Sequence, residues 1–172
     1  MSETHSEARI TLAPEGAADV ETGLPVLDHL VGELAQAGRL RVALEVAPGS
    51  ADEAVTAAGR ALGRAVAARL AAGAGWAMLP ADEALALVAL EQAPEGRLVT
   101  NVDFSDERVG GVATDVAARF LEALAVEAGI NLHVRLVEGT DPQHVLAAIF
   151  KSVGAALGQA LRPVQPDVEE AT

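Results

Sequence analysis

The chain has 172 residues, a formal net charge of −13 and no cysteine. This length suits one domain with a buried core, and the lack of cysteine excludes disulfides, thiolate metal sites and cysteine nucleophiles. The acidic balance argues against nucleic acid and anionic membranes as partners. No apolar run approaches the roughly 20 residues of a membrane span, and the polar start does not resemble a signal peptide. We therefore expect a cytoplasmic protein with no membrane or nucleic-acid partner.

The first half of the chain predicts two helices with a strand between them. Apolar side chains recur in both helices with a period near 3.6 residues, and Gly38 follows the first helix as a candidate cap. The strand alternates strictly between polar and apolar residues, which is typical of a half-buried strand. The expected ranges are 25–37 for the first helix, 39–46 for the strand and 52–70 for the second helix.

The second half predicts two strands, at 85–90 and 98–104, which a loop joins into an antiparallel pair. Glycines at 110–111 mark a break after them. A helix, an alternating strand and a long helix follow, and the long helix is expected to begin with Asp141 as N-cap and Pro142 as its first residue. The expected ranges are 114–128 for the helix, 130–136 for the strand and 142–161 for the long helix.

The order helix, glycine, strand, turn and long helix therefore occurs twice, about 91 residues apart. With this offset Gly38 falls on Gly129, and Arg60 falls on Lys151. A repeated order with a fixed offset predicts an internally duplicated α+β fold in which helices cover a sheet. The expected organisation is a loose arm at 1–8, one domain at 9–162 made of repeats 9–75 and 76–162, and an acidic tail at 163–172.

Three of the four histidines are candidate metal ligands, whereas the fourth, His5, lies in the expected arm. His29 and His144 each fall in the first turns of a helix, where the positive end of the helix dipole favours a neutral, ligating imidazole. His133 falls on the polar face of its strand. Because no two of them form a His-x-His or i, i+4 pair, three surface or cap histidines remain the alternative.

Two acidic pairs and two separate basic residues are further candidates. The first acidic pair would be either helix N-terminal charges or carboxylate ligands for Mg or Mn, and the second either loop charges or site carboxylates. Each basic residue could hold a phosphate, although a lone basic residue is usually solvated. The chain has no P-loop, no GxGxxG and no nucleophile elbow. These candidates are Asp52 with Glu53, Asp82 with Glu83, Arg97, and Lys151.

Five stretches, in order, resemble motifs of the imidazoleglycerol-phosphate dehydratase family of histidine biosynthesis. The resemblance covers roughly residues 20–162. The similar segments are 22–30 (TGLPVLDHL) for the family's TGI-x-FLDHM, 80–85 (PADEAL) for P-x-DEAL, 96–103 (GRLVTNVD) for GRPYL…N-x-E, 131–136 (NLHVRL) for TLHVRL, and 139–151 (GTDPQHVLAAIFK) for G-x-x-x-HHIIEAIFKA.

The resemblance implies a duplicated fold of the ribosomal S5 domain 2-like type and subunits that form trimers within a 24-subunit shell. It also implies two Mn ions per site and the dehydration of imidazole glycerol phosphate to imidazole acetol phosphate. In that chemistry a metal-bound imidazolate acts as an electron sink while a carboxylate takes a proton. The substrate or phosphate positions that the resemblance carries over are Asp28, Asp82, Glu83, Arg97 and Lys151.

The sequence departs from the family motifs mainly at the positions of metal ligands and of catalytic and phosphate-binding residues. The first motif, HHxxED, would lie at residues 52–57, where both histidines and the glutamate are absent. In the second, HHxxE, Gln143 and Ala147 replace a histidine and the glutamate. Of eight expected ligands only His29, His133 and His144 remain. The KET strand is expected to be missing because residues 9–22 are too short for it, the arginine of a YRFG segment is replaced, and the SSKG phosphate loop is absent.

The resemblance and these departures lead to two hypotheses about function, one a binding or assembly protein and the other an enzyme. The leading hypothesis is a family member that has lost the dehydration and acts as a binding or assembly protein. It would need no cofactor, would associate with itself as a trimer, and would have a small phosphorylated ligand as its candidate partner. The alternative is an active dehydratase with an altered metal site. In it Mn would be held by His29, His133 and His144, with Asp52 and Glu53 as substitute ligands.

Overall fold

The computed structural model describes residues 6–104, 108–109, 112–113 and 115–164. His5, the glycines at 110–111 and most of the expected acidic tail lie outside the described residues.

The first repeat folds as two strands, a helix, a third strand and a second helix. The third strand lies between the other two, in the order β1-β3-β2, antiparallel to β1 and parallel to β2. The elements are β1 (Glu7–Leu12), β2 (Ala17–Glu21), α1 (Pro25–Gly38), β3 (Leu40–Glu45) and α2 (Ala51–Ala67).

The second repeat has the same arrangement with one added strand. Its sheet has the order β4-β5-β9-β6, in which β9 is antiparallel to β5 and parallel to β6. A short antiparallel pair, β7 with β8, precedes its first helix. The elements are β4 (Ala74–Ala81), β5 (Ala84–Gln92), β6 (Arg97–Thr100), β7 (Arg108–Val109), β8 (Val112–Ala113), α3 (Asp115–Ala128), β9 (Ile130–Glu138) and α4 (Pro142–Leu161).

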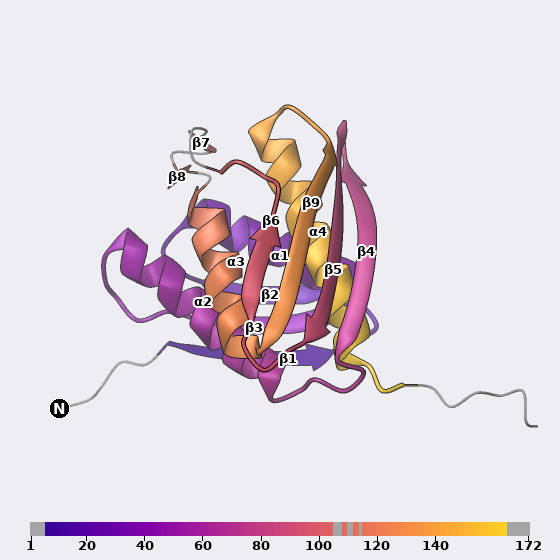
Figure 1. The fold of residues 1–172 in the computed structure, drawn as a ribbon. Helices are drawn as coiled ribbons and strands as arrows, with labels where there is room; N and C mark the ends of the chain where they lie inside the picture. Colours follow the sequence, from indigo (N-terminus) through magenta and orange to yellow (C-terminus); the bar gives the residue numbers. More distant parts are fainter. Residues whose placement is uncertain (1–5, 105–107, 110–111, 114, 165–172) are drawn as a thin grey trace, which may run out of the picture.

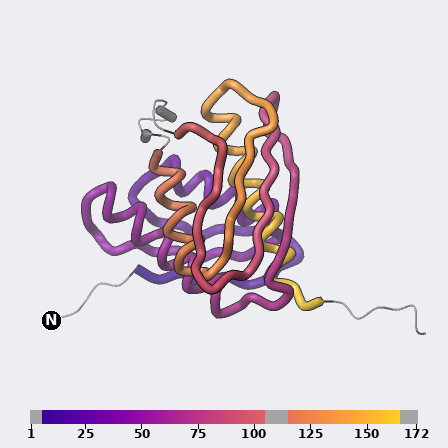
Figure 2. The backbone as a smooth tube through the Cα atoms, in the orientation of Figure 1, coloured from indigo at the N-terminus to yellow at the C-terminus, as the bar shows by residue number. Residues whose placement is uncertain are grey.

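The expected duplicated α+β fold is therefore confirmed. The chain runs from β2 through α1 to β3, and it later runs from β6 through α3 to β9 with the same pairing (Figure 2). The proposed boundary between repeats, at residues 75 and 76, falls inside β4.

The elements stack in four layers, with the two sheets outermost (Figure 1). Helices α1 and α2 cover the inner face of the first sheet, and α3 and α4 cover the inner face of the second. Each repeat's long helix packs on the other repeat's first helix, so that α2 lies on α3 and α4 lies on α1. The core is mainly Leu, Val, Ile and Ala, with a stacked pair, Phe120 and Phe150, between α3 and α4.

Helix α4 is long and apolar enough, by length and composition, to cross a membrane, although no apolar run of that length was expected. However, 72% of its apolar window is buried inside the protein. Its buried Ser152 donates to the carbonyl of Ala86 at 2.9 Å and accepts from the amide of Leu79 at 3.1 Å. These contacts are those of a core helix that holds β4 and β5 in place.

The strand predictions need two corrections. The strands expected at 85–90 and 98–104 do not pair with each other, because β9 lies between β5 and β6. A short loop between two strands favours a hairpin. Strand β9 has backbone hydrogen-bonding groups on both edges, and pairing with β5 on one edge and β6 on the other satisfies them and places β9 inside the sheet. The sequence predicts that residues 9–22 are too short for the KET strand, yet an N-terminal strand, β1, is present, without the KET signature. It begins at Glu7, inside the expected arm, and its partner β3 supplies the pairing.

The predicted cap of the first helix is also wrong by one residue. Helix α1 includes Gly38, and the left-handed residue after it is Arg39, with φ 53°. The equivalent position after α3 is Gly129, with φ 69°. The repeats therefore align Arg39, not Gly38, with Gly129. Gly38 is instead a packing residue, because a Cβ there would collide with the backbone of Gly154 in α4.

Candidate functional site

A pocket of about 800 Å³ opens between the N-terminal halves of α1 and α4, beside the turn that joins β4 to β5. Its ionisable side chains come from these three elements, which are far apart in the sequence. They are His29 and Glu33 from α1, Asp82 from the turn, and His144 and Lys151 from α4. The pocket therefore collects four of the residues that the sequence singled out.

Local sequence fixes each of these elements at its start. Asp28 accepts hydrogen bonds from the amide of Thr22, at 3.0 Å, and from its hydroxyl, which ties the loop before α1 to the helix. Asp141 caps α4 by accepting from the amide of Gln143 at 2.9 Å, and Pro142 follows it, as expected. Asp82 has φ 52°, a left-handed conformation that aspartate tolerates better than most residues.

His144 is held between carboxylates. Its Nδ1 lies 2.6 Å from Oε2 of Glu83, and its Nε2 lies 3.2 Å from Oδ2 of Asp82. The hydrogen bond that His144 donates to Glu83 raises the pKa of His144, and Asp141 and Asp82 add to the rise, whereas desolvation opposes it. The same hydrogen bond lowers the pKa of Glu83 to about 2.

The carboxylates around His144 therefore act against the neutral, ligating imidazole that was expected there. A helix N-terminus disfavours imidazolium by a fraction of a charge at several ångströms. Two full carboxylate charges within 3.2 Å outweigh it. Nδ1 of His144 is thus placed to donate a hydrogen bond to Glu83 in the β4–β5 turn.

The other two basic side chains of the pocket have weaker protein contacts. Nζ of Lys151 donates to the carbonyl of Pro80 at 3.4 Å, and Nε2 of His29 lies 3.6 Å from Oε1 of Glu33. The side chain of His29 is 69% exposed. Both groups can turn toward a ligand in the pocket.

The predicted site residues His133 and Arg97 lie on the second sheet. His133 is exposed on the outer face of β9, while its neighbours Leu132 and Val134 point into the core, as the alternation predicted. Arg97 lies on the adjacent strand β6, at the register position paired with Asn131. Neither residue lines the pocket between α1 and α4.

The acidic pair at the start of α2 is engaged locally. Glu53 forms a capping box with Ser50, which accepts from the Glu53 amide at 3.2 Å and whose own amide donates to the Glu53 carboxylate at 3.3 Å. Asp52 accepts from Nη1 of Arg119 on α3 at 2.6 Å. Nη2 of the same arginine lies 3.2 Å from Asp115.

Arg119 was not among the sequence candidates. The predicted offset of 91 residues pairs His29 with Phe120. The observed helix starts pair His29 with Arg119, as the fifth residues of α1 and α3. The structure thus gives Asp52 and Glu53 the alternative role that the sequence left open, as charges and caps at a helix N-terminus.

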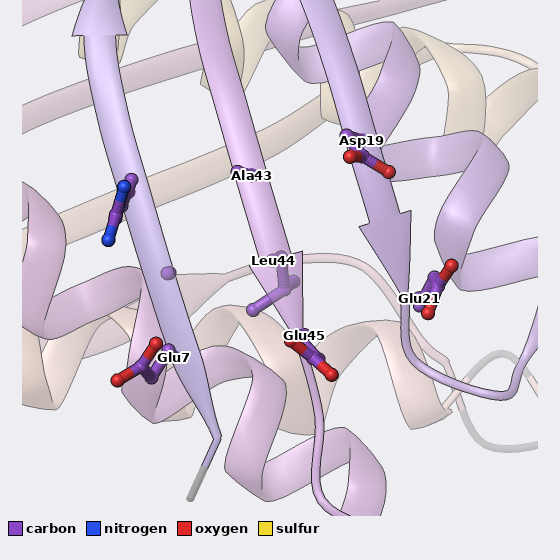
Figure 3. Close-up of a pocket in the computed structure, with 8 residues that line it drawn as sticks. Glu7, Asp19, Glu21, Ala43, Leu44 and Glu45 are labelled. Atoms are coloured by element: carbon purple, nitrogen blue, oxygen red, sulfur yellow. The ribbon is translucent and has the colours of Figure 1, made fainter.

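A second hollow, of about 360 Å³, lies on the outer face of the first sheet. Glu7, Glu45 and Glu21 occupy neighbouring positions on the adjacent strands β1, β3 and β2 (Figure 3). Like charges opposite one another on adjacent strands destabilise a sheet. This row is a feature of the outer surface and does not contact the candidate site.

The sequence profile described as Imidazoleglycerol-phosphate dehydratase matches residues 22–157, which is most of the chain. The chain belongs to the imidazoleglycerol-phosphate dehydratase family. It is 37% identical to the imidazoleglycerol-phosphate dehydratase of Desulfitobacterium hafniense strain Y51, covering 93% of this chain and 86% of that protein. It is 34% identical to the corresponding protein of Metallosphaera sedula, covering 92% and 86%.

Solved structures of the family agree with the fold. The imidazoleglycerol-phosphate dehydratase of Staphylococcus aureus N315 superposes with a TM-score of 0.82 at 25% identity, covering 92% of this chain and 94% of that one. The Pyrococcus furiosus structure, in complex with (S)-C348, has a TM-score of 0.78 at 21% identity, covering 96% and 94%. The latter likeness concerns the fold alone.

The family resemblance implies Mn, but the donors of this chain do not fit such a centre. Across the described ranges of one copy, no group of three or more His, Asp or Glu side chains could hold a metal ion. Gln143 and Ala147 occupy two motif positions in or beside the pocket, and neither is a strong ligand. Both ring nitrogens of His144 already face carboxylates.

Proposed function

We propose that this member of the family has lost the metal-dependent dehydration and acts as a cytoplasmic binding or assembly protein that needs no cofactor. One observation carries the proposal: at both motif positions, the residues that stand where metal ligands belong contact other side chains or lack donor atoms. Asp52 contacts Arg119, His144 contacts Glu83, and Ala147 has no donor.

The pocket between α1 and α4 supports binding of a small phosphorylated ligand. His29 and Lys151 both line it and make only long contacts with the protein. The ammonium of Lys151 and the imidazole of His29, on neighbouring helices, can both donate hydrogen bonds to an anion such as a phosphate group. The volume of about 800 Å³ is within the range of small-molecule sites.

The second candidate is an active dehydratase with an altered metal site. The names of the relatives favour it, because proteins 37% and 34% identical over most of the chain are called imidazoleglycerol-phosphate dehydratase. Taken alone, these comparisons support this candidate better than the first. The residues at the site favour the first, because Gln143 and Ala147 stand where the resemblance places a histidine and a glutamate.

A bacterial strain that requires histidine because it lacks the dehydratase decides between the two candidates. Expression of this chain should not restore growth without histidine, whereas a family member with both HHxxE motifs should. A direct assay with imidazole glycerol phosphate and added Mn should show no turnover by the folded protein. Growth or turnover would establish the second candidate.

Binding is measured separately by calorimetry with imidazole glycerol phosphate as the probe. We expect weak binding that Lys151→Ala abolishes and that Arg60→Ala, on the distant helix α2, leaves unchanged. A heat signal of equal size in both variants would remove this pocket from the proposal.

A further inference from the structure

The duplication creates two equivalent helix junctions in the molecule. His29 and Arg119 are the fifth residues of α1 and α3, and Gln143 and Asp52 are the second residues of α4 and α2. Since α1 packs on α4 and α3 packs on α2, each pair meets at the start of a long helix.

The two junctions differ in what fills them. At the α1–α4 junction, His29 and Gln143 line the open pocket. At the α3–α2 junction, the guanidinium of Arg119 bridges two carboxylates, Asp52 at 2.6 Å and Asp115 at 3.2 Å. The hydrogen bond that Arg119 donates to Asp52 raises the pKa of Arg119 further above its usual value. A guanidinium that bridges two carboxylates makes a charge-assisted hydrogen bond to each of them, an arrangement that suits arginine.

We propose that Arg119 is a built-in cation that has taken the place of a divalent metal ion at the start of α2. The resemblance places the first HHxxE motif at residues 52–57, and there the chain now has a carboxylate and, facing it, a fixed positive charge. A metal ion would have to displace the guanidinium from Asp52 and Asp115 before it could bind. This inference deepens the proposed function, but its test does not depend on activity.

The test is thermal unfolding of the full chain in metal-free buffer and at rising MnCl2. Wild-type protein should unfold at the same temperature with chelator and with Mn. Arg119→Ala should unfold at a lower temperature, because Asp52 and Asp115 then face each other as like charges. Mn should restore part of that loss with a midpoint of about 1 mM, the weak end of carboxylate sites.

Three variants isolate the effect. Arg60→Ala removes the same charge from the same groove, and Arg119→Lys keeps a cation, so neither should respond to Mn. The double variant Arg119→Ala/Asp52→Asn should lose the response that Arg119→Ala gains. If Arg119→Ala shows no stabilisation by Mn, the inference is overturned.

If Mn raises the unfolding temperature of the wild type, the Asp52→Asn variant distinguishes two explanations. If Asp52→Asn abolishes this rise, a metal binds beside Arg119 and the inference is wrong. If Asp52→Asn leaves it intact, the metal binds elsewhere, which contradicts the proposed function. In that case the response gained by Arg119→Ala, measured above that of the wild type, still decides the role of Arg119.

Discussion

His144 is the residue whose surroundings differ most from what its position in a helix suggests. The largest cause of both pKa shifts in its cluster is one contact, the hydrogen bond between its imidazole and Glu83. A histidine with a raised pKa stabilises the fold below its ordinary value of 6.5, and this contribution disappears as pH rises through the raised value. A glutamate with a lowered pKa stabilises it above 4.5, and this contribution disappears as pH falls toward about 2.

The first prediction follows from these signs. The difference in unfolding temperature between wild type and His144→Gln should be largest between about pH 4.5 and 6.5 and should vanish in alkaline solution. Because the cluster lies at the surface, the difference should shrink in high salt. His133→Gln, on the outer sheet face, is the control. A difference that grows above pH 7 would contradict the assignment.

At the scale of elements, close helix contacts hold the two repeats together. A Cβ at Gly154 in α4 would overlap the backbone of Leu34 in α1, and one at Gly59 in α2 would overlap Phe120 in α3. Each long helix thus uses a glycine to approach the first helix of the other repeat. Backbone cannot move aside as a flexible side chain can, so these positions tolerate no side chain.

The second prediction is that Gly154→Ala lowers the free energy of unfolding by about 1–3 kcal/mol, despite alanine's better helix propensity. Gly32→Ala in α1 is the matched control. Its Cβ would have no neighbour within 4 Å, so it should stabilise the protein by roughly 0.5–1 kcal/mol. Urea unfolding of the two variants measures both values. Equal effects would mean that the helices do not depend on this contact.

At the scale of the whole molecule, the outer face of the second sheet is incompletely covered. Trp76 and Met78 of β4 are 63% and 49% exposed, and Val99 of β6 and Val137 of β9 are exposed on the same sheet. Arg97 and Arg135 lie on this sheet too, whereas the outer face of the first sheet carries the glutamate row of Figure 3. An apolar face of this kind usually meets a partner.

The third prediction is that the protein forms a small oligomer, which the resemblance suggests is a trimer, and no 24-subunit shell. Multi-angle light scattering should show this mass, and Trp76→Glu should reduce it. Val126→Glu adds the same charge at an exposed apolar position of α3 and should not change the mass. A monomeric wild type would contradict a role in assembly, and an intact shell would contradict the proposed loss of metal sites.

The sequence by itself determined the helices, the core strands β3, β5 and β9, and the duplication. Their apolar periodicity is a local property of the sequence that does not depend on how the elements pack. The motifs that pointed to the family are local in the same way. Strands β1 and β2 escaped prediction because their outer faces are polar and they are short. Strand β4 has apolar residues on both faces, so it shows no polar/apolar alternation. Pairing with β3 and β5 orders these strands.

Only the tertiary structure decided what the candidate residues do. It brought His29, Asp82, His144 and Lys151 to one pocket and left His133 and Arg97 on an outer face. It also paired Asp52 with Arg119, 67 residues away. The charge state favoured at His144 and the availability of Asp52 depend on partners that are distant in the sequence. Electrostatic interactions act through space over a few ångströms, so no local pattern could have revealed them.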